Sequence, residues 1–148
     1  MRLAGDTRVP PVIPCCRRKA EFGPRGIPRE VEVPGASKDT VFIISSDRLG
    51  HGSEELGAQL MAKFVQQMAT LPDKPHAIVF YNGGVRLLTA DSPCVEGFRH
   101  LEHDGTDLLA CGTCVDFYQL RERIAAGHVT DMRAIVAAIQ AAPKVVTV

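Results

Sequence analysis

Apolar runs and helical patterns alternate along the chain from residue 40 onward. Residues 41–44 and 77–81 are continuous apolar runs, which are typical of strands that are covered on both faces. Residues 107–110 form a shorter run, and residues 144–148 form the last one. These four segments are predicted to be strands.

A long amphipathic helix is expected after the first run. Ser53 can cap its N-terminus, and two glutamates follow in the first turn. The apolar stripe recurs at every fourth residue, and Met61 and Val65 widen it toward the core. The stripe consists of Leu56, Leu60, Phe64 and Met68.

Three further helices are expected. One covers residues 93–103, and a second follows Cys114, carries Phe117, Leu120 and Ile124 on one side, and ends at Gly127. Thr130 is predicted to cap the last helix. Its apolar residues have the i, i+3, i+4, i+7 spacing and are Met132, Ile135, Val136 and Ile139.

Strands that alternate with helices indicate βαβ units and a parallel sheet. We therefore predict an α/β fold, a three-layer α/β/α sandwich whose mostly parallel sheet has four or five strands. We place this domain at residues 37–148. Residues 1–36 hold six of the ten prolines and show no periodicity, so we interpret them as a disordered Pro/Arg/Gly-rich leader or linker with incidental thiols at Cys15 and Cys16.

The charge balance argues against several functions. Seventeen basic residues balance seventeen acidic ones, so the chain has no net positive charge that would attract nucleic acid or an anionic membrane. No stretch approaches the roughly 20 apolar residues of a membrane span. Five cysteines in no framework spacing fit a reducing compartment, so the cytoplasm is the expected location.

The strongest chemical signal is Cys111-Gly112-Thr113-Cys114, which follows the third predicted strand. Ligands of an open parallel sheet bind beyond the carboxyl ends of its strands, where this segment should lie. A helix N-terminus there would favour the thiolate, the nucleophilic form of cysteine. Thr113 is the expected N-cap, with Asp116 in a capping contact, although this carboxylate would disfavour the thiolate.

Two other interpretations of these thiols remain open. They can simply pack in the core as small apolar groups. They can also hold zinc, with His51 and Cys94 as further ligands, but no second ligand pair has zinc spacing and we expect no metal.

Two other loops should reach the same sheet edge. Gly50-His51-Gly52 lacks the spacing of a dinucleotide-binding loop, so we expect no cofactor. His51 can instead approach the thiols. Asn82-Gly83-Gly84 forms a tight turn or a binding loop, so Asn82, Gly83, Gly84 and Thr113 join His51 as candidate substrate-binding residues.

Several segments together resemble the C-terminal domain of YedF-type proteins, sulfurtransferase-like selenium-metabolism proteins of the DsrE superfamily. The resemblance covers nearly all of residues 40–148. It is carried by Ile43-Ile44-Ser45-Ser46, Gly50-His51-Gly52, Glu55-Leu56-Gly57, Tyr81-Asn82-Gly83-Gly84-Val85, Ala110-Cys111-Gly112-Thr113-Cys114-Val115-Asp116-Phe117-Tyr118 and Gly127-His128-Val129-Thr130-Asp131-Met132.

The resemblance implies a DsrE-like fold, a homo-oligomer, and a relay of persulfide sulfur or of selenium between donor and acceptor proteins. Cys111 resembles the reactive cysteine of the family, which leaves Cys114 as the resolving thiol or a second carrier thiol. Typical YedF-type chains begin with a TusA-like domain bearing Cys-Pro-x-Pro, a motif that Cys15-Cys16-Arg17-Arg18 does not match. A separate TusA-like carrier is therefore an expected partner. A thiol–disulfide oxidoreductase and a non-catalytic binding module remain alternatives.

Overall fold

The structure, a computed structural model, describes residues 40–148. The predicted leader at residues 1–36, with Cys15 and Cys16, lies outside the described residues. The described elements are β1 (Thr40–Ile44), α1 (Glu54–Thr70), β2 (Ala77–Phe80), η1 (a 3₁₀ helix, Asn82–Leu88), α2 (Val95–His103), β3 (Asp107–Cys111), α3 (Gly112–Phe117), β4 (His128–Thr130), α4 (Met132–Ala141) and β5 (Lys144–Thr147).

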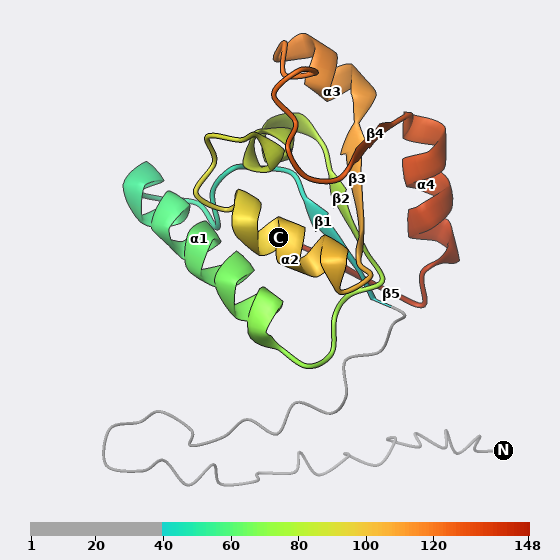
Figure 1. The fold of residues 1–148 in the computed structure, drawn as a ribbon, viewed down its shortest axis with the longest axis horizontal. Coiled ribbons are helices and arrows are strands. Elements are labelled where there is room, and N and C mark those ends of the chain that lie inside the picture. Colours follow the sequence, from blue (N-terminus) through green and yellow to red (C-terminus); the bar gives the residue numbers. More distant parts are fainter. Residues whose placement is uncertain (1–39) are drawn as a thin grey trace, which may run out of the picture. The chain divides into compact units, whose positions relative to one another are not determined.

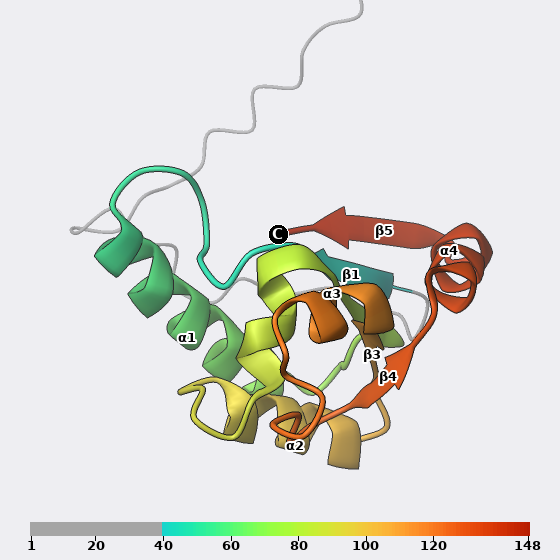
Figure 2. The ribbon, with the colours of Figure 1, turned by 90° about the horizontal axis from the view of Figure 1, so that it is seen from above.

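The five strands form one parallel sheet in the order β4-β3-β2-β1-β5. Helices α1 and α2 cover one face of the sheet, and α4 covers the other (Figures 1 and 2). The predicted three-layer α/β/α sandwich is therefore confirmed. All four predicted strands are present, and β4 is the additional one. Sequence analysis missed it because its three residues include a single apolar side chain.

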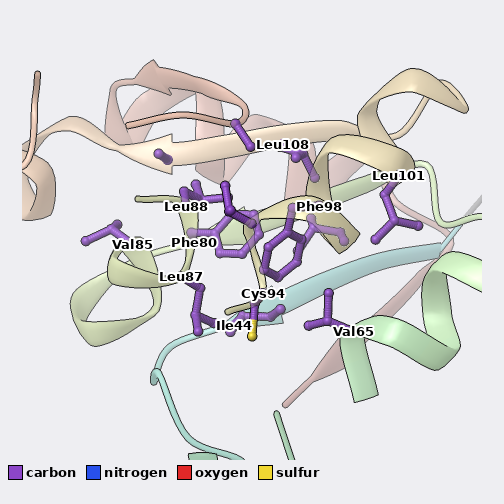
Figure 3. Packing of buried hydrophobic residues seen from close by; sticks show 14 of the residues in the cluster. Ile44, Val65, Phe80, Val85, Leu87, Leu88, Cys94, Phe98, Leu101 and Leu108 are labelled. Atoms are coloured by element: carbon purple, nitrogen blue, oxygen red, sulfur yellow. The ribbon is translucent and has the colours of Figure 1, made fainter. Parts of the chain in front are cut away.

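The larger core lies between the sheet and helices α1 and α2. Phe80 of β2 meets Phe98 of α2 edge-on, with ring centroids 5.0 Å apart (Figure 3). The two helices cross closely because Gly97 has no side chain, and a Cβ there would lie 2.7 Å from Val65 Cγ1. The smaller core, on the α4 face, contains Cys111.

The predicted stripe of α1 is rotated from the buried face. Gly57, Met61, Val65 and Met68 are buried, whereas Leu56 and Leu60 are 54% and 40% exposed. Gly57 faces inward because the backbone of the β1–α1 loop packs against it, with Arg48 Cβ 3.1 Å from the position of a Cβ. The predicted helical period was right. The pattern of apolar residues did not reveal the buried face because a glycine has no apolar side chain to mark it.

Two other helix predictions were wrong in extent. The helix after β3 is only Gly112–Phe117, and Gln119 has a left-handed backbone (φ 55°) that ends it. Phe117, expected to be buried, is 78% exposed. The last helix begins at Met132 and is capped by Asp131, because Thr130 belongs to β4.

No helix within residues 40–148 is long and apolar enough to cross a membrane.

Candidate functional site

The carboxyl edge of the sheet gathers the three segments that the sequence placed there. The loop after β1, the start of η1 and the start of α3 each follow a strand, and the three strands are parallel and adjacent (Figure 1). Any groups that these segments carry therefore meet on one side of the molecule.

The two thiols of the CxxC segment have different environments. Cys111 ends β3, precedes the first residue of α3, and is completely buried on the α4 face of the sheet. Cys114 lies within α3, is partly exposed, and packs against both cores. Both cysteines are free, and Cys111 lies close enough to Cys114 to raise the pKa of its thiol. Of these two thiols, only that of Cys114 is partly exposed.

Asn82 connects η1 to the accessible thiol. Its backbone N–H donates a hydrogen bond to Cys114 Sγ over 3.0 Å. Asn82 has a left-handed backbone (φ 50°), a conformation in which asparagine is enriched among residues other than glycine. The turn that the sequence predicted at Asn82 thus aims a backbone donor at the sulfur.

Tyr118 and Arg86 extend this arrangement. The Tyr118 hydroxyl donates to Asn82 Oδ1 over 3.0 Å, and Arg86 Cζ lies 4.3 Å from the centre of the Tyr118 ring. Arg86 also forms a loose ion pair with Asp47, with 3.6 Å between Nη1 and Oδ2. These contacts join the loop after β1, η1 and the segment after α3.

The pKa of the Cys114 thiol is raised above its ordinary value. Burial is the largest cause, because it penalises the charged thiolate, and the neighbouring Cys111 adds to it. The Asn82 N–H acts in the opposite direction by stabilising negative charge on sulfur. Because α3 has only six residues, fewer than two turns, its dipole is a smaller aid to the thiolate than we expected.

The other predicted site residues have varied positions. His51 is exposed in the loop after β1, and within residues 40–148 no hydrogen bond or ion pair joins it to a thiol. Gly84 is buried, and a Cβ there would lie 2.1 Å from the carbonyl oxygen of Ile44. Its role is therefore close packing against β1. Gly83 has ordinary space for a Cβ, 3.6 Å from the nearest atom, Asp47 N.

The predicted capping contact at α3 is absent. Cys111 occupies the N-cap position, and the exposed Thr113 lies inside the helix. Asp116 instead accepts two hydrogen bonds from Arg121, at 2.8 and 2.9 Å. Because this pair neutralises the carboxylate, Asp116 opposes a thiolate at Cys114 less than its sequence position suggests.

Cys94, considered above as a zinc ligand, lies in the larger core near Ile44, Leu87 and Val65 (Figure 3). Burial raises the pKa of its thiol. Within the described part of the chain, no group of three or more His, Cys, Asp or Glu side chains could hold a metal ion.

Sequence analysis missed the contacts of Tyr118, and it interpreted Arg86 as a solvated side chain that could pair with an anion. The available signal was spacing, since Tyr118 follows Cys114 by four residues, about one helical turn. Its partner Asn82 lies 36 residues away, a pairing that only the parallel sheet reveals.

No family model matches the sequence, and no curated protein matches it. Solved structures do match. The protein of unknown function MTH1491 from Methanobacterium thermoautotrophicum has a TM-score of 0.54 and 21% identity, covering 74% of this chain and 97% of its own. The ychN protein from E. coli has a TM-score of 0.53 and 16% identity, covering 76% of this chain and 100% of its own.

A third match is the conserved protein of unknown function BT1422 from Bacteroides thetaiotaomicron, with a TM-score of 0.53 and 13% identity, covering 75% of this chain and 96% of its own. At these identities the likeness establishes the fold alone. The chain has the architecture of a small α/β/α protein with a parallel sheet, in agreement with the DsrE-like fold that the sequence resemblance implies.

Proposed function

We propose that this protein is a carrier of sulfur or selenium that holds the chalcogen on Cys114, as a YedF-type protein of the DsrE superfamily. The observation that carries the proposal is the hydrogen bond from the Asn82 N–H to the Sγ of an accessible cysteine. A backbone donor at this distance stabilises the anionic sulfur of a thiolate or a persulfide.

In our proposal the two thiols have roles opposite to those expected from the sequence, and their different burial supports this. Family resemblance favoured Cys111 as the nucleophile, but its side chain is completely buried, whereas Cys114 is partly exposed. A donor persulfide can approach Cys114 without rearrangement of the core. Cys114 is therefore the loaded thiol in our proposal, and Cys111 is the resolving one.

Loading is a balanced exchange. The Cys114 thiolate attacks the outer sulfur of a donor persulfide, the donor's S–S bond breaks, and the donor leaves as a thiolate while Cys114 becomes a persulfide. An acceptor thiolate then attacks the outer sulfur and frees Cys114. Alternatively, Cys111 attacks the inner sulfur, which releases hydrosulfide and forms the Cys111–Cys114 disulfide. An external dithiol reductant then reduces this disulfide and restores both thiols.

The partners belong to the same proposal. They are donor and acceptor proteins of sulfur or selenium, including a separate TusA-like carrier, in the cytoplasm. A homo-oligomer would cover apolar side chains on α4 and β5 that are 40–48% exposed, namely Met132, Val136 and Val145.

The test is the intact mass of the reduced full-length protein after exposure to a persulfide donor. We expect the wild type to gain about 32 Da for each sulfur that it binds. Cys114→Ser should bind one sulfur fewer. Sulfur bound at Cys15 or Cys16 would persist in that variant, so the difference isolates Cys114. Cys94→Ser, at a buried thiol outside the CxxC pair, is the matched control and should load like the wild type.

A thiol–disulfide oxidoreductase is the second candidate, favoured by the closeness of the two thiols. It predicts a loss of about 2 Da in the wild type and no sulfur adduct in Cys111→Ser, where a persulfide on Cys114 could not be resolved. If neither change occurred, both functions would be excluded, and the thiols would serve packing in a binding module.

A further inference from the structure

A cleft lies beside the Tyr118 end of the contacts that hold Cys114. Its volume is about 510 Å³, within the range of roughly 300–1,000 Å³ typical of small-molecule sites. Its apolar floor includes Leu87 and Leu120, and its polar groups come from the loop after β1, η1, the segment before α2 and the segment after α3. These groups are Asp47, Arg86, Thr89, Asp91, Ser92, Tyr118 and Arg123.

The two arginines of the cleft differ in their freedom to bind a ligand. Arg123 Nη2 donates to both oxygens of Asp91, at 2.8 and 2.9 Å. Arg86 is half exposed, and its contact with Asp47 is 3.6 Å long, beyond the usual hydrogen-bond distance. The Arg86 guanidinium lies over the Tyr118 ring, and most of its N–H donors remain for an incoming carboxylate.

The charges of the cleft suit a zwitterion better than a simple anion. Two guanidinium groups face two carboxylates, so the lining has no net charge. A ligand with a carboxylate and an ammonium group can pair with Arg86 and Asp47 at once, whereas inorganic anions gain only the first contact.

The cleft and the thiol are joined by two side chains. From Arg86 the contacts pass through the Tyr118 ring and hydroxyl to Asn82, whose N–H reaches Cys114 Sγ. A donor held at Arg86 must span these groups to bring its sulfur to Cys114.

We propose that this cleft binds a low-molecular-weight persulfide with free carboxylate and ammonium groups, and that Arg86 holds its carboxylate. This inference rests on the proposed carrier function and names the chemical class of the donor. The Cys114 thiolate takes the outer sulfur of the persulfide, and the donor leaves as its thiolate, so atoms and electrons balance.

The test compares two donors, glutathione persulfide and inorganic polysulfide, in loading Cys114 of the full-length protein. The variant is Arg86→Gln, and Arg133→Gln on the exposed surface of α4 is the control. We expect Arg86→Gln to raise about tenfold the concentration of glutathione persulfide that gives half-maximal loading. Loading by polysulfide, which has no carboxylate, should be affected much less, and a denaturant titration shows whether Arg86→Gln is folded.

Other outcomes separate this inference from the proposed function. The cleft is not the donor site if Arg86→Gln slows loading by both donors equally or by neither. The same conclusion follows if polysulfide alone loads the wild type. In each of these cases the carrier function stands. If neither donor loads the wild-type protein at Cys114, both the carrier function and the cleft assignment are overturned.

Discussion

The Tyr118 hydroxyl donates a hydrogen bond to Asn82 Oδ1 over 3.0 Å, and this contact fixes the residue that faces the accessible thiol. Asn82 has a left-handed backbone (φ 50°), and its N–H donates to Cys114 Sγ over 3.0 Å. A side-chain contact between segments 36 residues apart therefore holds a backbone donor in place.

Tyr118→Phe tests this relationship. Loss of the hydroxyl should slow sulfur loading of Cys114 about three- to tenfold, because the Asn82 N–H is held less firmly against the sulfur. The free energy of unfolding should fall by only about 1 kcal/mol, the usual contribution of one hydrogen bond. Loading is measured by mass spectrometry, and stability by denaturant unfolding.

Tyr81→Phe is the matched control for Tyr118→Phe, because Tyr81 is the only other tyrosine of the chain. It should load Cys114 at the wild-type rate. Equal slowing in both variants would contradict a specific role for the Tyr118 hydroxyl.

The pH dependence of Cys114 alkylation follows from the direction of its pKa shift. Burial and Cys111 raise the pKa of this thiol above its ordinary value of 9.0, so its thiolate fraction at neutral pH is smaller than that of a free cysteine. The rate of iodoacetamide labelling at Cys114, followed by peptide mapping, should rise with pH and reach half its maximum above pH 9.

A Cys111→Ser variant should move that midpoint toward lower pH. The neighbouring Cys111 thiol and its negative charge when ionised are among the causes of the raised pKa of Cys114. A midpoint below the ordinary cysteine value in the wild type would show instead that the Asn82 N–H outweighs burial.

Gly83 and Gly84 provide a matched pair that separates packing from substrate binding. Gly84→Ala places a Cβ 2.1 Å from the Ile44 carbonyl oxygen, and should lower the free energy of unfolding by about 3 kcal/mol. Gly83→Ala meets only ordinary contacts and should change it by less than about 1 kcal/mol. Urea unfolding measures both values.

Sulfur loading in Gly83→Ala then tests the substrate-binding role that the sequence suggested for this residue. A folded Gly83→Ala protein that loads poorly would support it. Equal stability of the two alanine variants would contradict the close approach of η1 to β1.

The sheet was predictable from the sequence because its strands are buried on both faces. Continuous apolar runs such as residues 77–80 are typical of strands covered on both faces. The carboxyl-edge position of Cys111 and Asn82 followed from the same parallel topology. Short elements were less predictable, since β4 and α3 are set by tertiary contacts and not by a periodic pattern.

The contacts within the site could not be predicted. The hydrogen bond from Asn82 to Cys114 uses a backbone donor, which has no signature in the side-chain sequence. The complete burial of Cys111 depends on the last residue of β3 facing α4, and a shift of one residue would reverse it. The difference in burial between the two thiols therefore required the structure.

The buried face of α1 gives a last prediction, which tests the register of the helix. Met61 is fully buried, whereas its neighbour Leu60 is 40% exposed, although the spacing of apolar residues placed Leu60 on the central stripe. Met61→Ala should lower the free energy of unfolding by about 2–5 kcal/mol because it leaves a cavity in the core. Leu60→Ala should lower it by about 0.5 kcal/mol in the same denaturant titration, since an exposed side chain loses little burial. The reverse order would place the predicted stripe, and not the observed face, against the sheet.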